Sequence, residues 1–266
     1  MPAPQPASFL YHASAFALSG HLKRPVEHLI EVQGGTTLPT TGGHGSAHVE
    51  NFRFDHAVSF KTGYAHVSGS EKVEGNKTLH TTLSTSVVEG LNILDVVTAD
   101  RIVARLASSF EPGKAESRIL LLGSRFENLR VAGCKIDVEL DHELAMKLDT
   151  FEAVRNEFKK NKEFRKMTGD PFGQGKVQDE VKAHGIICCS FVKDLRSSNC
   201  PGVKHHGHNG CVLEVPEFGR IYLAEVMLEH GRKTLTMLRV ELGSPNGGGV
   251  VAAQAMTNGR PPGGSG

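Results

Sequence analysis

The chain of 266 residues contains no tryptophan and only three tyrosines. Proteins that bind sugars or single-stranded nucleic acids usually stack their ligands on such rings, so this shortage counts against both classes. The 30 Lys and Arg residues almost balance the 29 Asp and Glu residues. A nucleic-acid binder would show a basic surplus, and we therefore expect no nucleic-acid partner.

Long apolar runs and catalytic motifs are missing as well. No run of 18 apolar residues occurs, so we expect no membrane span. The opening "MPAPQPASFLYH" lacks the basic and apolar regions of an export signal. The nucleophile elbow GxSxG, the Walker loop and the GxGxxG fingerprint are absent from the sequence, and we expect no enzymatic activity. Apolar residues still make up 39% of the chain, which is enough for a packed core.

What the sequence does contain is a two-residue rhythm. In "LHTTLSTSVV" (79–88), Leu79, Leu83 and Val87 share one face, and the alternation in "KIDVEL" (135–140) is sharper. Such alternation is typical of half-buried antiparallel strands. Thirty glycines and twelve prolines supply turns between short strands. The pattern predicts a mainly β fold, an antiparallel β-sandwich.

One segment follows the helical period instead. Over 141–166 a single apolar stripe is formed by Leu144, Leu148, Phe151, Val154 and Phe158. Acidic residues gather in its first half and basic residues in its second, as the helix dipole favours. We predict an amphipathic helix here and a shorter helical turn over 176–183.

These patterns predict a single β-rich domain over 9–257. Within it we interpret 141–211 as an insert made of the amphipathic helix and a hairpin. The N-terminal residues 1–8 and the Gly- and Pro-rich tail 258–266 are predicted to be flexible from their composition.

The segment "NCPGVKHHGHNGC" (199–211) contains the strongest candidates for metal ligands. They are Cys200, His205, His206, His208 and Cys211. Imidazole and thiolate are the usual ligands of zinc, although this spacing fits no standard zinc template. The alternative is a polar hairpin loop, which a Cys200–Cys211 disulfide would fasten in an oxidising compartment. Zinc is the one cofactor that the sequence suggests.

Several strand patterns, in order and spacing, resemble the bacterial choice-of-anchor P proteins. They are "YHASAFALSGHL" (11–22), "TTLPTTGGHGSAHVENF" (36–52), "LDVVTADRIVARLASSF" (94–110), "SRFENLRVAGCKIDVEL" (124–140) and "GRIYLAEVMLEHGRKTLTMLRVEL…GGGVVAAQAM" (219–256). The resemblance implies a mainly β, exported, surface-associated domain with no established activity. It supplies no catalytic residues.

These observations favour a non-enzymatic structural or interaction protein that self-associates through strand edges or through the insert. The resemblance implies a cell-surface or extracellular location, and the missing export signal makes the cytoplasm the alternative. A metal-binding module or metal-dependent enzyme centred on 199–211 is the second hypothesis. A carbohydrate- or small-ligand-binding sandwich is the third.

Overall fold

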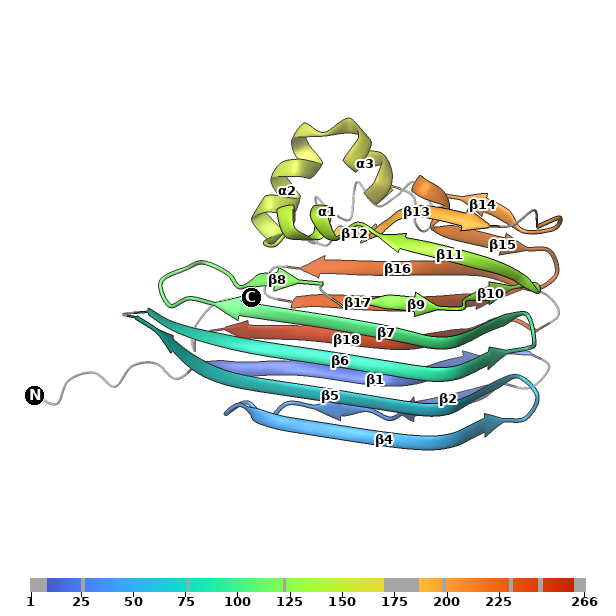
Figure 1. Cartoon of the computed structure of the whole chain (residues 1–266), viewed down its shortest axis with the longest axis horizontal. Coiled ribbons are helices and arrows are strands. Elements are labelled where there is room, and N and C mark those ends of the chain that lie inside the picture. Colours follow the sequence, from blue (N-terminus) through green and yellow to red (C-terminus); the bar gives the residue numbers. More distant parts are fainter. Residues whose placement is uncertain are drawn as a thin grey trace, which may run out of the picture.

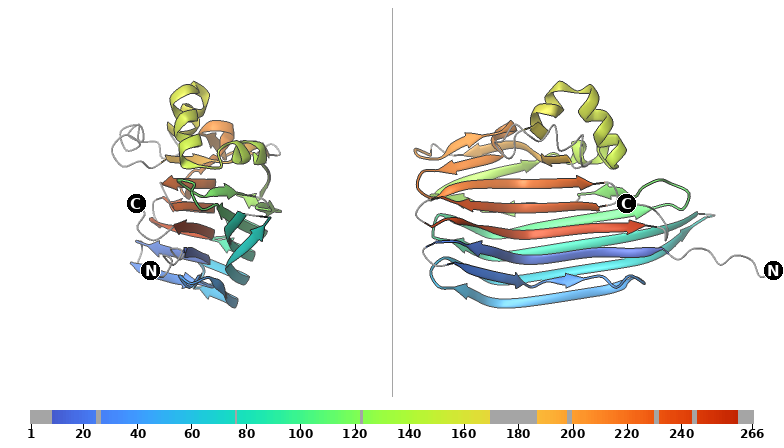
Figure 2. Two further views of the ribbon diagram at one scale, coloured as in Figure 1. Left: turned by 90° about the vertical axis from the view of Figure 1, so that its left-hand side faces the viewer. Right: turned by 180° about the vertical axis from the view of Figure 1, so that it is seen from behind.

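The computed structural model is a sandwich of two antiparallel sheets, which confirms the predicted fold class (Figure 1). Seen from the side, the two sheets form separate layers (Figure 2). The structure describes residues 9–24, 27–75, 77–121, 123–169, 187–197, 200–229, 232–243 and 246–260. The helical turn predicted over 176–183 lies outside these residues.

Sheet A runs in the order β14-β15-β16-β17-β18-β1-β2, with β12 paired to β16 and β3 to β1. Its strands are β1 (Leu10–Leu22), β2 (His28–Gln33), β3 (Thr36–Thr37), β12 (Ile187–Ser190), β14 (Lys204–His206), β15 (Val212–Val215), β16 (Gly219–Glu229), β17 (Arg232–Leu242) and β18 (Gly248–Arg260). The last strand thus extends three residues into the segment predicted as a flexible tail.

Sheet B runs in the order β13-β11-β10-β7-β6-β5-β4, with β8 and β9 paired to β7. Its strands are β4 (Gly43–Phe54), β5 (Val58–Glu74), β6 (Lys77–Ile93), β7 (Val97–Phe110), β8 (Arg118–Leu120), β9 (Arg125–Glu127), β10 (Arg130–Val131), β11 (Cys134–Leu140) and β13 (Val192–Ser197). Tight turns join several neighbours. In the turn between β6 and β7, Leu94 and Asp95 both have left-handed φ angles, which match the twist of a hairpin.

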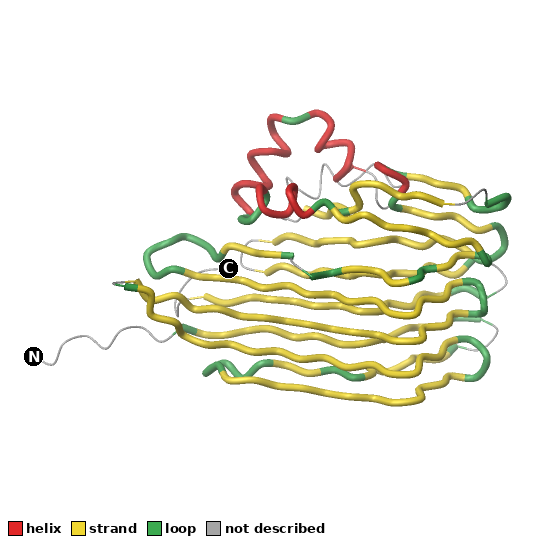
Figure 3. The backbone as a smooth tube through the Cα atoms, viewed as in Figure 1, coloured by secondary structure: helices red, strands yellow, loops and turns green. Residues whose placement is uncertain are grey.

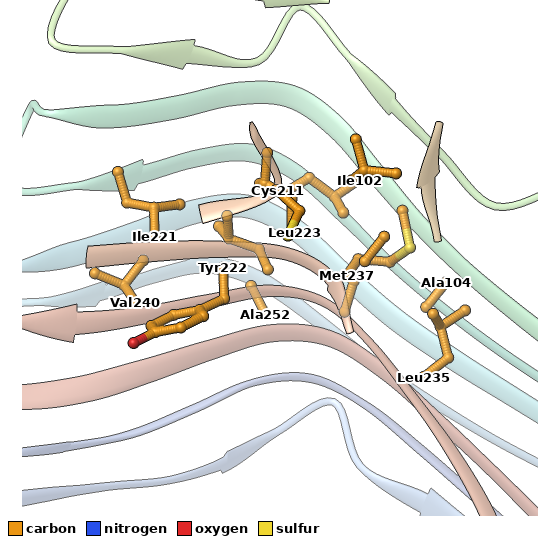
Figure 4. Close-up of a cluster of buried hydrophobic side chains, with 14 of the residues drawn as sticks. Ile102, Ala104, Cys211, Ile221, Tyr222, Leu223, Leu235, Met237, Val240 and Ala252 are labelled. Atoms are coloured by element: carbon orange, nitrogen blue, oxygen red, sulfur yellow. The ribbon is translucent and has the colours of Figure 1, made fainter. Parts of the chain in front are cut away.

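The core lies between the sheets and takes side chains from both. Figure 4 shows Ile102 of β7 near Leu223 and Met237 of sheet A, all fully buried. Part of the interface is built from small polar residues. Ser84 and Ser86 of β6 are fully buried, so the inward side of this strand includes its serine face.

An irregularity crosses each sheet and shifts the inward-facing positions by one residue. In sheet A, Ala224 and Ala253 have left-handed φ angles of 49° and 53°, and the strand pairing is interrupted there without a change of register. Asn51 and Gly90 take the same place in sheet B, with φ of 53° and 63°. Adjacent Ala252 and Ala253 are consequently both buried, which simple alternation forbids.

The predicted helix is three short helices, seen in red along the upper edge of the sandwich (Figure 3). They are α1 (His142–Lys147), α2 (Phe151–Lys160) and α3 (Lys162–Gly169). Capping side chains divide them: Asp141 accepts a hydrogen bond from Leu144 N, Thr150 from Ala153 N and Asn161 from Glu163 N. Such residues favour helix starts over helix interiors.

The rest of the predicted insert widens both sheets. β12 pairs with β16 of sheet A, and β13 pairs with β11 of sheet B. The helices are therefore carried by strands that belong to the sandwich itself. In the described part of the chain, no helix has the length and apolar content that crossing a membrane requires.

Candidate functional site

The segment predicted as a metal site lies at the upper edge of sheet A. His205 and His206 occupy β14, and the short 3-10 turn η1 (His208–Gly210) follows. Because they are consecutive in a strand, His205 and His206 point to opposite faces. Cys211 belongs to the apolar core, where 4% of it is exposed. The segment therefore spreads its candidate ligands instead of gathering them.

The distances support this description. His206 Nε2 lies 3.6 Å from Glu214 Oε2, and His205 Nε2 lies 3.4 Å from Ser197 Oγ. The side chain of His208 lies outside the described residues. Among those that are described, no three His, Cys, Asp or Glu side chains are grouped to hold a metal ion. Zinc binding by this segment stays a prediction.

Cys200 forms a disulfide with Cys134, across 66 positions of sequence and a Cα–Cα distance of 6.0 Å. The Cys200–Cys211 bridge that the hairpin-loop alternative included is therefore replaced by a Cys134–Cys200 bridge. Cys211 is held elsewhere, since its carbonyl accepts a hydrogen bond from Leu223 N and its side chain points into the core. The disulfide fastens the start of β11 in sheet B to the loop that leads into β14 of sheet A. As a disulfide partner, Cys200 has no thiolate to offer a metal.

Cys189 of β12 is also buried, with 1% of it exposed. Burial raises the pKa of its thiol well above the ordinary value, and the neighbouring Cys188 and Cys211 raise it further. The thiolate is the form that binds metals and attacks substrates. A thiol held protonated in this way fits a packing role.

A charge network on sheet A was missed by the sequence reasoning. Arg239 donates two hydrogen bonds to Glu225, at 2.6 and 2.9 Å, and a third to Glu241. Its guanidinium lies 3.7 Å from the centroid of the Tyr222 ring, and the Tyr222 hydroxyl donates to Glu241 at 2.9 Å. Burial opposes the charge of Arg239, but the two carboxylates raise its pKa overall. Only the strand register brings these residues together, and the sequence does not reveal it.

The network continues toward the predicted metal segment. Arg220 of β16 lies 3.3 Å from Glu214, and the same Glu214 oxygen is the one near His206. Arg220 also hydrogen-bonds Tyr222, so His206 lies at one end of a chain of polar and charged side chains across β14 to β17. In the partly buried pair of Arg239 and Glu225 each charge has its partner, as burial requires.

The lower boundary of the sandwich presents a different feature, the open edge of β4 (Figure 1). Within the described residues, β4 pairs with β5 and with no other strand. An unpaired edge exposes backbone N–H and C=O groups that can pair with another chain. β4 has 12 residues, against six for β13 at the opposite edge of sheet B.

The two edges of sheet B also differ in charge. β13 carries Lys193 and Arg196, which form ion pairs with Glu139 on β11. Charges of this kind discourage edge pairing. The sequence of β4, "GHGSAHVENFRF", contains no Lys and no Pro, and its two Asp, Glu, Lys or Arg residues, Glu50 and Arg53, lie in its second half, so Gly43–Val49 has none. The β4 edge is thus the longer and the less protected of the two.

A family model described as "Domain of unknown function (DUF8256)" matches residues 9–229. The resemblance to the choice-of-anchor P family is therefore wrong, because the strand patterns that suggested it are common to antiparallel sandwiches. No curated protein and no solved structure matches the chain.

Proposed function

The chain belongs to the family described as "Domain of unknown function (DUF8256)", and we propose that it is a non-enzymatic interaction protein that self-associates through the edge of β4. In this arrangement β4 pairs antiparallel with β4 of a second copy. A two-fold axis relates the copies, and sheet B continues from one into the other. The observation that carries the proposal is the length of the edge, 12 residues paired on one side among the described strands.

The side chains of β4 suit such pairing. His44, Ser46 and His48 are exposed, while Ala47 and Val49 on the other face are half-buried. The added strand of a second copy would lie beside β4 and satisfy the backbone groups of its edge, and its side chains would pack beside Ala47 and Val49 on the same face.

We place the protein at the cell surface or outside the cell. The Cys134–Cys200 disulfide supports this location, because disulfides persist in oxidising compartments and are rare in the cytosol. Alkylation of thiols in freshly lysed source cells, followed by mass spectrometry, would test it. Labelling of both cysteines before reduction would contradict the location.

Size-exclusion chromatography with light scattering tests self-association directly. We expect the wild-type mass to rise with concentration to that of a dimer. Ala47→Lys places a charge on the inward side of the edge, a device that blocks strand pairing, and should keep the protein monomeric.

Thr62→Lys is the matched control. It adds the same charge on β5, opposite Glu50 and Glu89 and away from the open edge, so it should dimerise like the wild type. Circular dichroism would check that both variants fold. A wild type that stays monomeric at millimolar concentration, or equal masses for Ala47→Lys and the wild type, would overturn the proposal.

A further inference from the structure

A cavity of about 440 Å³ opens at one end of the sandwich, between the two sheets. This is the end where β4 turns into β5 and β6 into β7, on the right of Figure 1. Its volume falls in the range of small-molecule sites. Of β4, only its last residue, Phe54, lines the cavity, and Ala47, the edge residue substituted above, does not, so ligand binding can be tested independently of self-association.

The walls of the cavity are apolar and come from both sheets. Leu22 ends β1 and Leu242 ends β17 in sheet A. In sheet B, Phe54 ends β4, and Ala57 and Leu94 lie in the turns that follow β4 and β6. The ring of His28 packs against Phe54 with centroids 4.4 Å apart. Such walls favour an alkyl chain or an aromatic ring.

The mouth of the cavity carries hydrogen-bond donors. Arg24, His56 and Asn246 line it. No ion pair joins Arg24 to any carboxylate of the described residues. A guanidinium binds a carboxylate through two parallel hydrogen bonds and is the side chain best suited to that task.

The hydrogen bonding of His56 fixes its role. Its Nδ1 lies 3.2 Å from Arg53 Nη2. Because a guanidinium nitrogen can only donate, Nδ1 must accept, and the ring proton is then on Nε2. His56 therefore offers an N–H donor to the cavity that Arg24 also lines.

We propose that this cavity binds a small organic acid, with its apolar body between the sheets and its carboxylate at Arg24 and His56. Asp55 also lines the mouth, and its carboxylate opposes an anion. The proposal therefore predicts opposite changes in affinity for the acid. Removing the charge of Arg24 should weaken binding, and removing the charge of Asp55 should strengthen it.

Isothermal titration with decanoate, below its micellar concentration, is the experiment, and decanol is the uncharged comparison. We expect one decanoate per chain and at least tenfold weaker binding of decanol. Arg24→Met should weaken decanoate binding about tenfold, a loss typical of a charge-assisted contact. Asp55→Asn should tighten it severalfold.

Lys61→Met is the control, because it removes one exposed cation from β5, which does not line the cavity. It should leave binding unchanged. Equal binding of decanol and decanoate, an equal loss in Lys61→Met and Arg24→Met, or no saturable binding of decanoate would each overturn the assignment.

Discussion

The hydroxyl of Ser84 on sheet B donates a 2.6 Å hydrogen bond to the main-chain carbonyl of Ser14 on sheet A. Ser86 makes the equivalent bond to Phe16, also at 2.6 Å. These bonds link the two layers of the sandwich, from side chains of sheet B to the backbone of sheet A. They require the sheets to approach closely, which small residues such as Ala15 and Ala17 on the facing strand allow.

Replacing Ser84 tests this close approach. We expect Ser84→Ala to lower the free energy of unfolding by about 1 kcal/mol through the lost hydrogen bond. Ser84→Val should lower it by about 2–3 kcal/mol, because the larger side chain also overpacks the interface. Urea denaturation measures the free energy of unfolding of both variants. If valine proved as stable as serine, the sheets would not be this close.

The serine face also shows where sequence reasoning succeeded and where it failed. Period-two alternation is a local property, so it predicted the strands and the sandwich correctly. It could not say that the Ser84 face of β6 meets the other sheet, because that depends on partners about 70 residues away. The left-handed residues that shift the alternation, such as Ala253, could not be predicted either, because alanine gives no local signal for that conformation.

The candidate site was harder to predict than the fold. The sequence shows that 199–211 is rich in His and Cys. It does not show that the disulfide partner of Cys200 is Cys134, which is 66 residues away in the chain. The Arg239 network and the cavity at the end of the sandwich each depend on register between several strands. The order of residues along the chain does not give this register, so neither the network nor the cavity could be predicted.

Ala253 and its neighbour Ala252 provide a matched pair for testing backbone strain. Both are fully buried, but only Ala253 has a left-handed φ angle. Ala252→Gly should destabilise the protein by about 1–2 kcal/mol, through the lost methyl group and added chain entropy. The destabilisation by Ala253→Gly should be smaller than that by about 1 kcal/mol, because glycine adopts a left-handed φ angle without strain. Equal losses in urea denaturation would argue against strain at Ala253.

Lys233 is buried beneath the helices, with its Nζ 3.5 Å from Glu116 Oε2 and 1% of its side chain exposed. Glu116 also accepts hydrogen bonds from Phe151 N and Glu152 N at the start of α2. Breaking such a pair leaves a buried charge without its partner. We expect Lys233→Met to cost about 3–5 kcal/mol, and Lys233→Met combined with Glu116→Gln to cost less.

The same lysine predicts a dependence on pH. Burial lowers the pKa of Lys233 below its ordinary value of 10.5, although Glu116 partly opposes this shift. Between the two values the unfolded chain holds a proton that the folded chain has released. The contribution of Lys233 to the free energy of unfolding therefore rises with pH in that window. The difference in stability between wild type and Lys233→Met should grow as pH rises toward 10.5, and a constant difference would contradict the lowered pKa.

The Cys134–Cys200 disulfide should stabilise the fold by restricting the unfolded chain. Replacing both cysteines by serine is expected to cost about 2–4 kcal/mol. Dithiothreitol should lower the melting temperature of the wild type and leave that of the double variant unchanged. A wild type insensitive to the reductant would show that the bond contributes little.

The zinc hypothesis for 199–211 can be tested on the same protein. The disulfide removes Cys200 as a ligand and the core holds Cys211. His206 lies near Glu214 at one end of the charge network. We therefore expect purified protein to contain no stoichiometric zinc and EDTA to leave its melting temperature unchanged, since a structural zinc contributes directly to folding. One equivalent of zinc, lost in His206→Ala but kept in His142→Ala on the exposed surface of α1, would instead establish a metal site at this edge.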